Sequence, residues 1–325
     1  MFVAIPPSTS TDTYITSEDG ATWTTRTLPI TGVWYNIIHT GTVFFVIGYQ
    51  SSWTDLVALQ SVDGINWSTI ALPVTGNGGP WNVVAWNGSA FCAISPGFPD
   101  RVMTSATGTA WGTPVDLGYG TNSVLASGGG VFCTPAGDDV DPITITSPDG
   151  ITWTSHALPS NLLGVETQMP MAWGGGTFCA ISSVYSSWPD PRAVTSPDGA
   201  TWAYHSLPAG SGFTNLVWAG DFFCAIPALS ASTEAHTFVT NEDTAMTSPD
   251  GAVWTPHTLP RIEKWSGVAW DGNVICVVGD NYHALTSPDG AAWTEQTLPL
   301  DRATWIMAAG GAPSFWKNFR RSIEL

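Results

Sequence analysis

The amino-acid sequence predicts an all-β protein folded as a single seven-bladed β-propeller with four antiparallel strands per blade. Three observations predict this fold. One motif occurs seven times, at the period of roughly 40 to 50 residues that is typical of propellers and solenoids. Its fullest copies read Thr-Ser-Pro-Asp-Gly-x-x-Trp-Thr. The composition, with 34 Gly, 24 Pro and 43% hydrophobic residues in 325, favours strands over helices or disorder. The two ends of the chain match different strands of one repeat. The motif tryptophans are Trp23, Trp67, Trp111, Trp153, Trp202, Trp254 and Trp293.

The motif has the chemistry of a tight turn. Serine and aspartate side chains can accept hydrogen bonds from backbone N–H groups a residue or two on, glycine supplies a positive φ, and the tryptophan packs the next strand. The third copy, Ser105-Ala106-Thr107-Gly108, lacks the aspartate. An aspartate in such a turn is used by its own backbone, so we assign these residues a structural role. The motif aspartates are Asp19, Asp63, Asp149, Asp198, Asp250 and Asp289.

The pattern Ser-x-Asp-Gly-x-x-Trp resembles the Asp-box of the sialidase-like (BNR-type) β-propeller repeats, over nearly the whole chain. The resemblance implies that each box lies between the third and fourth strands of a blade, on the face away from a ligand site. The repeats are also similar to those of bacteriophage tail and virion proteins. That second resemblance implies a virion component made in the host cytoplasm, or otherwise an extracellular protein.

Each repeat is expected to begin with an apolar strand such as 81–86, to turn at Asn87-Gly88, and to continue as a strand over 90–94. The chain opens in a second strand, 1–6, and closes with a first strand, 305–309, so the last strand is expected to complete the first blade and remove an open edge. Residues 312–316 compete for the same second-strand place. We therefore predict a propeller over 1–311 and a tail over 312–325, which is either a frayed end or an attachment peptide.

The formal net charge of −17 opposes binding to nucleic acid or to an anionic membrane, because both require basic patches. The five cysteines share one position of the repeat, where Val3 and Phe45 stand in the other two copies, so we expect free core thiols. No apolar run is long enough to span a bilayer, and residues 1–5 match a repeat strand better than a signal peptide. The expected partners are a glycan or another virion protein, with assembly into an oligomer within a particle as an option.

Variation concentrates in the loops between second and third strands and in the links between blades, which strand alternation places on one rim. We call this the loop rim, and the opposite one the box rim. Loops that differ on a repeated scaffold are where binding residues usually lie. The candidate ligand-binding residues in these loops are Trp53, Tyr185, Trp188, Arg101 and Arg192.

A second candidate set opens the first strands and is expected to surround the mouth of the central channel. Two interpretations stay open for its tryptophans: packing between neighbouring blades, or stacking on the apolar faces of sugars. The mouth tryptophans are Trp34, Trp81, Trp265 and Trp305.

The sequence predicts neither a metal site nor a cofactor. His156, His205 and His257 each follow a box tryptophan by three residues, so they belong on the outer strands of separate blades and cannot converge. The acidic run 138–141 could hold Ca²⁺ but lacks a full coordinating pattern, and a solvated loop is the simpler interpretation.

We predict a non-catalytic recognition module, a receptor-binding or decoration protein that binds a glycan through the loop rim. Sialidase chemistry implies three arginines around a carboxylate, and only Arg101 and Arg192 share a position of the repeat, with Arg261 and Arg302 nearby. The alternatives are a structural virion or scaffold propeller that contacts other proteins, and a glycoside hydrolase whose paired carboxylates come from different blades. The glutamates available to that hydrolase are Glu166, Glu234, Glu242 and Glu263.

Overall fold

A computed structural model describes most of the 325-residue chain. The described residues are 1–7, 10–76, 78–97, 99–121, 124–137, 143–158, 169–181, 192–208, 212–227, 243–302 and 304–310. The predicted tail, 312–325, lies outside them.

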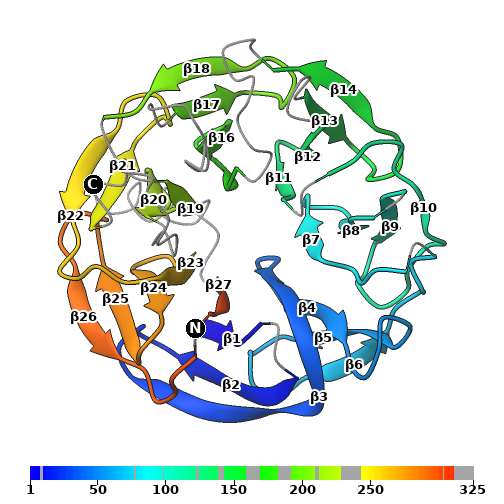
Figure 1. The fold of residues 1–325 in the computed structure, drawn as a ribbon, viewed down its shortest axis with the longest axis horizontal. Coiled ribbons are helices and arrows are strands. Elements are labelled where there is room, and N and C mark those ends of the chain that lie inside the picture. The colour runs from blue at the N-terminus through cyan, green and yellow to red at the C-terminus, as the bar shows by residue number, and fades with distance from the viewer. Residues whose placement is uncertain are drawn as a thin grey trace, which may run out of the picture.

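The described residues form an all-β structure of 27 strands, without a helix. Five antiparallel sheets have four strands each, and a sixth has seven. Figure 1 shows the sheets standing around a common centre, each running from an innermost strand to an outermost one. Each innermost strand packs against that of the next sheet, and β27 packs against both β23 and β3. The arrangement is that of a β-propeller.

The strand bounds follow the repeat. The seven-stranded sheet contains β27 (Ile306–Ala309), β1 (Phe2–Ile5), β2 (Thr11–Ser17), β3 (Trp23–His39), β4 (Phe44–Tyr49), β5 (Leu56–Ser61) and β6 (Ser68–Ala71). The next two sheets contain β7 (Val83–Trp86), β8 (Phe91–Ser95), β9 (Arg101–Ser105) and β10 (Val115–Asp116), and then β11 (Ala126–Gly128), β12 (Val131–Ala136), β13 (Ile143–Ser147) and β14 (Thr154–Ala157). The last three contain β15 (Met171–Gly174), β16 (Thr177–Ile181), β17 (Arg192–Ser196) and β18 (Ala203–Ser206); β19 (Phe213–Trp218), β20 (Phe223–Pro227), β21 (Thr244–Ser248) and β22 (Thr255–Thr258); and β23 (Trp265–Trp270), β24 (Ile275–Gly279), β25 (His283–Ser287) and β26 (Thr294–Thr297).

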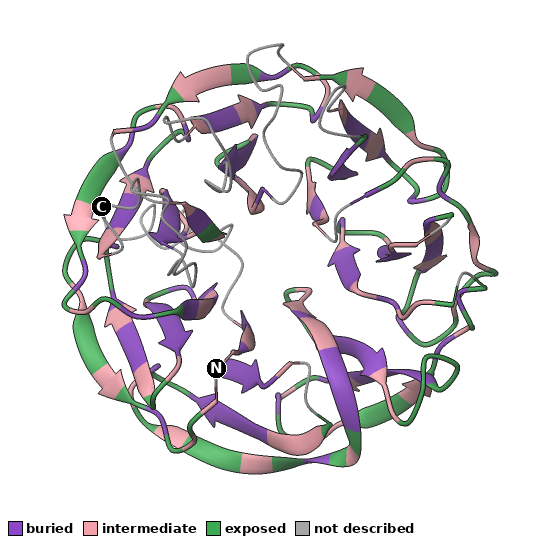
Figure 2. Ribbon diagram, viewed as in Figure 1, coloured by how far each residue is buried: buried purple, intermediate pink, exposed green. Residues whose placement is uncertain are grey.

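Burial follows the order of strands within a sheet. Second strands such as β8, β20 and β24 are buried along their whole length, whereas outer strands such as β14, β22 and β26 are mostly exposed. Figure 2 shows this as a buried interior and an exposed circumference. Both faces of an inner strand are buried because the neighbouring sheets stack against them, which explains why these strands read as continuous apolar runs.

One strand departs from the expected separation of repeats. β3 is continuous over 17 residues, and its first half pairs with β2 while its second half pairs with β4. The link 30–33, Ile-Thr-Gly-Val, is short and rich in β-branched residues, so the chain stays extended where other repeats have a loop. Two repeats are therefore joined into the seven-stranded sheet.

The two ends of the described chain pair as the sequence predicts. β27 lies antiparallel to β1, with Phe2 opposite Ala309 and Ile5 opposite Ile306. The backbone N–H of Gly310 also donates to the carbonyl oxygen of Met1 over 2.9 Å. The N-terminal strand therefore occupies the second-strand place that residues 312–316 were expected to compete for.

The box turn binds its own backbone, as its sequence indicates. In the first copy, Oδ1 of Asp19 accepts hydrogen bonds from the N–H groups of Ala21 (2.9 Å) and Thr22 (2.7 Å), and Oγ of Ser17 accepts one from the N–H of Gly20 (2.8 Å). The indole N–H of Trp23 donates to the Gly20 carbonyl oxygen. These bonds to the charged carboxylate hold the pKa below its usual range at Asp19, Asp63, Asp198, Asp250 and Asp289.

The box glycine also packs against the preceding repeat. Gly199 has φ +76°, and a Cβ placed on it would lie 2.7 Å from Cγ2 of Thr146 and 3.2 Å from Sγ of Cys133. Gly20, Gly150 and Gly251 meet the equivalent Thr–Cys pair of the preceding repeat. The five cysteines are buried and unpaired, as predicted. The box turns at Gly20, Gly150, Gly199 and Gly251 thus pack one repeat against the next.

The third repeat, which lacks the box aspartate, has the shortest outer strand. Oγ of Ser105 still accepts a hydrogen bond from the N–H of Gly108, and Oγ1 of Thr107 replaces the carboxylate at a longer 3.3 Å from the N–H of Thr109. The following strand, β10, has only two residues because Gly112 and Pro114 interrupt it. No helix in the described part of the chain is long and apolar enough to cross a membrane.

Candidate functional site

The four mouth tryptophans are buried, so the expectation that they form a stacking surface for a ligand is wrong. Their exposed fractions lie between 0 and 2%. Three indole N–H groups donate to backbone carbonyl oxygens, Trp34 to Thr11 (3.1 Å), Trp81 to Pro73 (2.9 Å) and Trp305 to Gly279 (3.1 Å). These rings pack between neighbouring sheets because a large aromatic side chain at the innermost strand is enclosed on both faces. The other interpretation, packing between neighbouring blades, is the correct one. The buried mouth residues are Trp34, Trp81, Trp265 and Trp305.

Trp53 is the candidate aromatic that the structure leaves accessible. It lies in the loop between β4 and β5 with 55% of its surface exposed. The loop is held by its own bonds, from the N–H of Gln50 to the carbonyl oxygen of Asp55 and from the N–H of Asp55 to that of Ser52. The other two loop aromatics, Tyr185 and Trp188, lie outside the described residues.

Two tyrosines stand at the base of the same loop. The ring centroids of Tyr35 and Tyr49 are 6.0 Å apart. Burial, together with the neighbouring Tyr49, raises the pKa of Tyr35 to about 12. Tyr35 therefore keeps its hydroxyl proton at neutral pH, and both rings lie beside the loop that carries Trp53.

The two repeated arginines are not brought into one site. Arg101 opens β9 and Arg192 opens β17, in different sheets. Nε of Arg101 is buried without a hydrogen-bond partner among the described residues. The guanidinium carbon of Arg192 lies 5.8 Å from the ring centroid of Tyr204, on the next strand of the same sheet. Arg101 and Arg192 therefore stand at equivalent places in two different sheets and do not form one site.

The histidines on outer strands occupy separate sheets, as predicted. Nε2 of His156 lies 2.8 Å from Oγ1 of Thr146, and His205 and His257 repeat this contact with Thr195 and Thr247. Within the described ranges, no group of three or more histidine, cysteine, aspartate or glutamate side chains is placed to hold a metal ion. The acidic run 138–141 lies outside those ranges.

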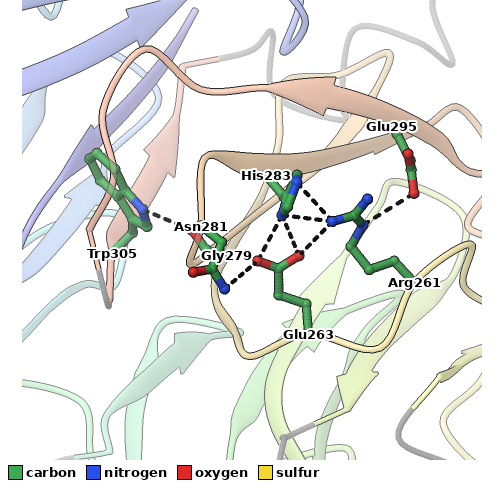
Figure 3. Close-up of polar contacts among 7 residues, drawn as sticks. All are labelled: Arg261, Glu263, Gly279, Asn281, His283, Glu295 and Trp305. Atoms are coloured by element: carbon green, nitrogen blue, oxygen red, sulfur yellow. Dashed lines mark hydrogen bonds and ion pairs between the residues drawn. The ribbon is translucent and has the colours of Figure 1, made fainter.

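A polar network lies on the loop rim of the last sheet, β23 to β26, and Figure 3 shows it in close-up. Glu263, in the link before β23, is 6% exposed, and its Oε1 lies 2.9 Å from Nδ1 of His283. NH1 of Arg261 lies 2.7 Å from Nε2 of His283, and Nε of Arg261 donates to Oε1 of Glu295 over 3.2 Å. Nδ2 of Asn281 also donates to Oε1 of Glu263.

His283 stands at the centre of this network and connects its acidic and basic side chains. An imidazole with its proton on Nδ1 can donate to Glu263 and accept at Nε2 from Arg261, so His283 links a buried carboxylate to a guanidinium. Arg261 then reaches Glu295 on the outer strand. Because each polar group restrains the next, the side chains are held in one arrangement before any partner binds.

The turn beside the network has an unusual backbone. Asp280 to His283 connects β24 to β25, and the N–H of His283 donates to the Asp280 carbonyl oxygen over 3.1 Å. Asn281 and Tyr282 have φ of +53° and +67°, and no other non-glycine residue in the described ranges has a positive φ. Burial raises the pKa of Asp280, and the nearby Lys264 opposes that rise. We call residues 261–264 with 280–283 and Glu295 the last-sheet site.

Sequence reasoning singled out Arg261 and Glu263 separately but missed His283 and the meeting of these three residues. One signal was available. The link 261–264, Arg-Ile-Glu-Lys, carries three charged residues in a chain that is only 11% charged. The hydrogen-bonded partners are 18 to 34 residues apart, so spacing alone could not show that they converge.

Comparison with solved structures agrees with the fold. The structure of YCF48 bound to D1 peptide is similar with a TM-score of 0.58 and 15% sequence identity, covering 90% of this chain and 86% of that one. YCF48 from Cyanidioschyzon merolae gives 0.55 and 12%, covering 82% and 86%, and a nidogen/laminin complex gives 0.51 and 8%, covering 96% and 100%. No protein-family model matches the chain, and no curated protein does. Identities this low show that the chain shares the β-propeller fold and nothing more specific.

Proposed function

We propose that the chain forms one closed seven-bladed propeller that acts as a non-catalytic recognition module, binding a polypeptide partner through the loop rim. Counted in both blades that it spans, β3 completes seven sets of four strands. The innermost strands form a complete cycle of neighbours, in which β27 lies between β23 and β3.

The observation that carries the function is the last-sheet site. Two large apolar side chains, Ile262 (60% exposed) and Tyr282 (47% exposed), flank a network whose polar groups are already fixed. Accessible apolar groups beside a pre-organised polar network are typical of protein-recognition sites, because side chains that are already fixed lose little conformational entropy on binding. Two propellers of similar fold occur in complexes with a peptide or a protein, which supports this choice of partner class.

The matched test uses two exposed aliphatic residues on opposite rims. A library of random 12-residue peptides is panned against the protein, and the dissociation constants of the enriched peptides are measured. Ile262→Asp is expected to weaken binding by about tenfold or more, as for an anchor side chain. Val253→Asp in a box turn, at 69% exposure, is expected to leave it unchanged. Loss of binding in Val253→Asp alone would assign the function to the box rim.

A glycan ligand is a second candidate, favoured by Trp53. Its exposed ring lies in a loop with Ser51 and Asp55, and stacking plus hydroxyl recognition is the usual chemistry of sugar sites. Burial of the mouth tryptophans removes them from this role and leaves Trp53 with its neighbouring tyrosines as the aromatic group of this loop. A glycan array with Trp53→Ala as the control separates this candidate from the first.

The absence of catalysis and a place in a phage particle are also proposals. The non-catalytic assignment is supported by the engagement of Glu263 with His283 and by the separation of Arg101 from Arg192 in different sheets. Release of reducing sugar from a glycan panel would contradict it. The virion assignment follows from the resemblance of the repeats, and detection of the chain in purified particles by immunolabelling tests it.

A further inference from the structure

The tyrosine of the turn Asp280 to His283 is retained at a cost to folding. With both central residues in the left-handed region, the turn has the backbone of a two-residue hairpin loop of type I′. Asparagine tolerates its first position, and the second strongly favours glycine, because a side chain there strains the backbone. Tyr282 occupies that second position with φ +67°.

Burial offsets this strain only in part, because 47% of the Tyr282 surface stays exposed. A strained non-glycine residue with an accessible side chain indicates selection for something other than stability.

The contacts around the turn place Tyr282 and Ile262 next to the same network. Asn281 and His283, which precede and follow Tyr282, contact Glu263 and Arg261, which follow and precede Ile262. Ile262 and Tyr282 are both exposed. The two residues therefore border the network that Figure 3 shows.

The charge of this surface and of the whole chain favours a cationic partner. The segments that form and follow this site carry four acidic residues, Glu263, Asp280, Glu295 and Asp301, and three basic ones, Arg261, Lys264 and Arg302, which leaves a local balance of −1. Arg261 is shared between Glu263 and Glu295. The chain as a whole carries −17, a field that attracts basic segments and repels acidic ones.

We propose that Tyr282 is the anchor for a basic segment of a polypeptide partner, a proposal that rests on the recognition function above. A lysine or arginine side chain lies over the face of the Tyr282 ring, with its aliphatic stem against Ile262. The exposed carboxylates of Glu295 and Asp301 balance the incoming charge. The network beneath holds the turn in place.

The test measures fluorescence anisotropy of 12-residue peptides enriched from the random library, at about 50 mM and about 300 mM NaCl, where screening differs strongly. The enriched peptides are expected to be rich in lysine and arginine and to bind more weakly at the higher salt. Tyr282→Gly is expected to weaken binding by about tenfold or more, as for an anchor residue, and Tyr282→Phe to keep it. The melting temperature of Tyr282→Gly is expected to equal or exceed that of the wild type, since the strain is relieved, so lost binding cannot be attributed to unfolding.

Two results would overturn this proposal. One is enrichment of acidic or uncharged peptides, and the other is an unchanged dissociation constant in Tyr282→Gly. In either case loss of binding in Ile262→Asp would leave the recognition function standing. A glycan-only result, with no peptide enriched, would reject both the basic partner and the polypeptide function and favour the Trp53 loop.

Discussion

Truncation of a mouth tryptophan tests whether these residues belong to the scaffold. Trp81 has no exposed surface, packs among Ile47, Leu72 and Val84, and donates its indole N–H to the carbonyl oxygen of Pro73. Trp81→Ala leaves a large cavity and an unpaired carbonyl, so we expect a loss of roughly 3 to 5 kcal/mol in the free energy of unfolding. Trp53→Ala removes an equally large but exposed side chain and should change that free energy by no more than about 0.5 kcal/mol.

Urea unfolding followed by far-ultraviolet circular dichroism measures both variants against the wild type. The comparison is internally controlled because the chemical change is the same and only the burial differs. A loss below about 1 kcal/mol in Trp81→Ala would refute the reasoning, since an enclosed tryptophan cannot be removed at so small a cost. It would return the mouth aromatics to the set of candidate ligand contacts.

Three further predictions follow from the box turns and the core. Gly199→Ala should lower the melting temperature more than Gly76→Ala, as measured by differential scanning calorimetry. Both glycines have a positive φ, but the new Cβ would lie 2.7 Å from Cγ2 of Thr146 at Gly199 and would meet nothing within 4 Å at Gly76. The box aspartates have depressed pKa values in the folded state, so their contribution to stability is present above the unfolded-state value of about 3.9 and is lost as pH falls through the folded one. The melting temperature should therefore drop steeply below about pH 4, in addition to a gentler fall below about pH 6.5 from His39, whose pKa burial lowers to about 4. A melting temperature that does not drop further below about pH 4 would contradict the role of the aspartates. All five thiols are buried, and burial raises the pKa of Cys133 and Cys224 to about 12. A thiol-specific disulfide reagent should therefore label no cysteine in the native protein and five after unfolding. Labelling of the native protein would contradict the assignment of the cysteines to the core.

The sequence predicts the parts of the fold that depend on local chemistry. The box turn uses Ser17, Asp19 and Gly20 within four residues of one another, so its hydrogen bonds could be anticipated from the motif. The pairing of β27 with β1 could be anticipated from the phase of the repeats at the two ends. The burial of the cysteines followed from the apolar residues that replace them in other copies.

What the sequence could not predict depends on how separate segments pack. Whether Trp81 stacks on a ligand or is enclosed by the neighbouring sheet depends on how closely the sheets approach, which no spacing reveals. The continuous course of β3 depends on pairing at both of its ends. The last-sheet site joins Arg261, His283 and Glu295 from three segments, and these side chains meet only once the segments are packed together.

Hydroxyl-radical footprinting of the complex with an enriched peptide tests the central claim, that recognition occurs on the loop rim, most directly. The account predicts reduced oxidation of Ile262 and Tyr282, which are accessible in the free protein, and no change at Val62 and Val253 in the box turns. Protection of the box-turn valines with Ile262 and Tyr282 still oxidised would contradict the account, because the partner would then occupy the opposite face of the propeller.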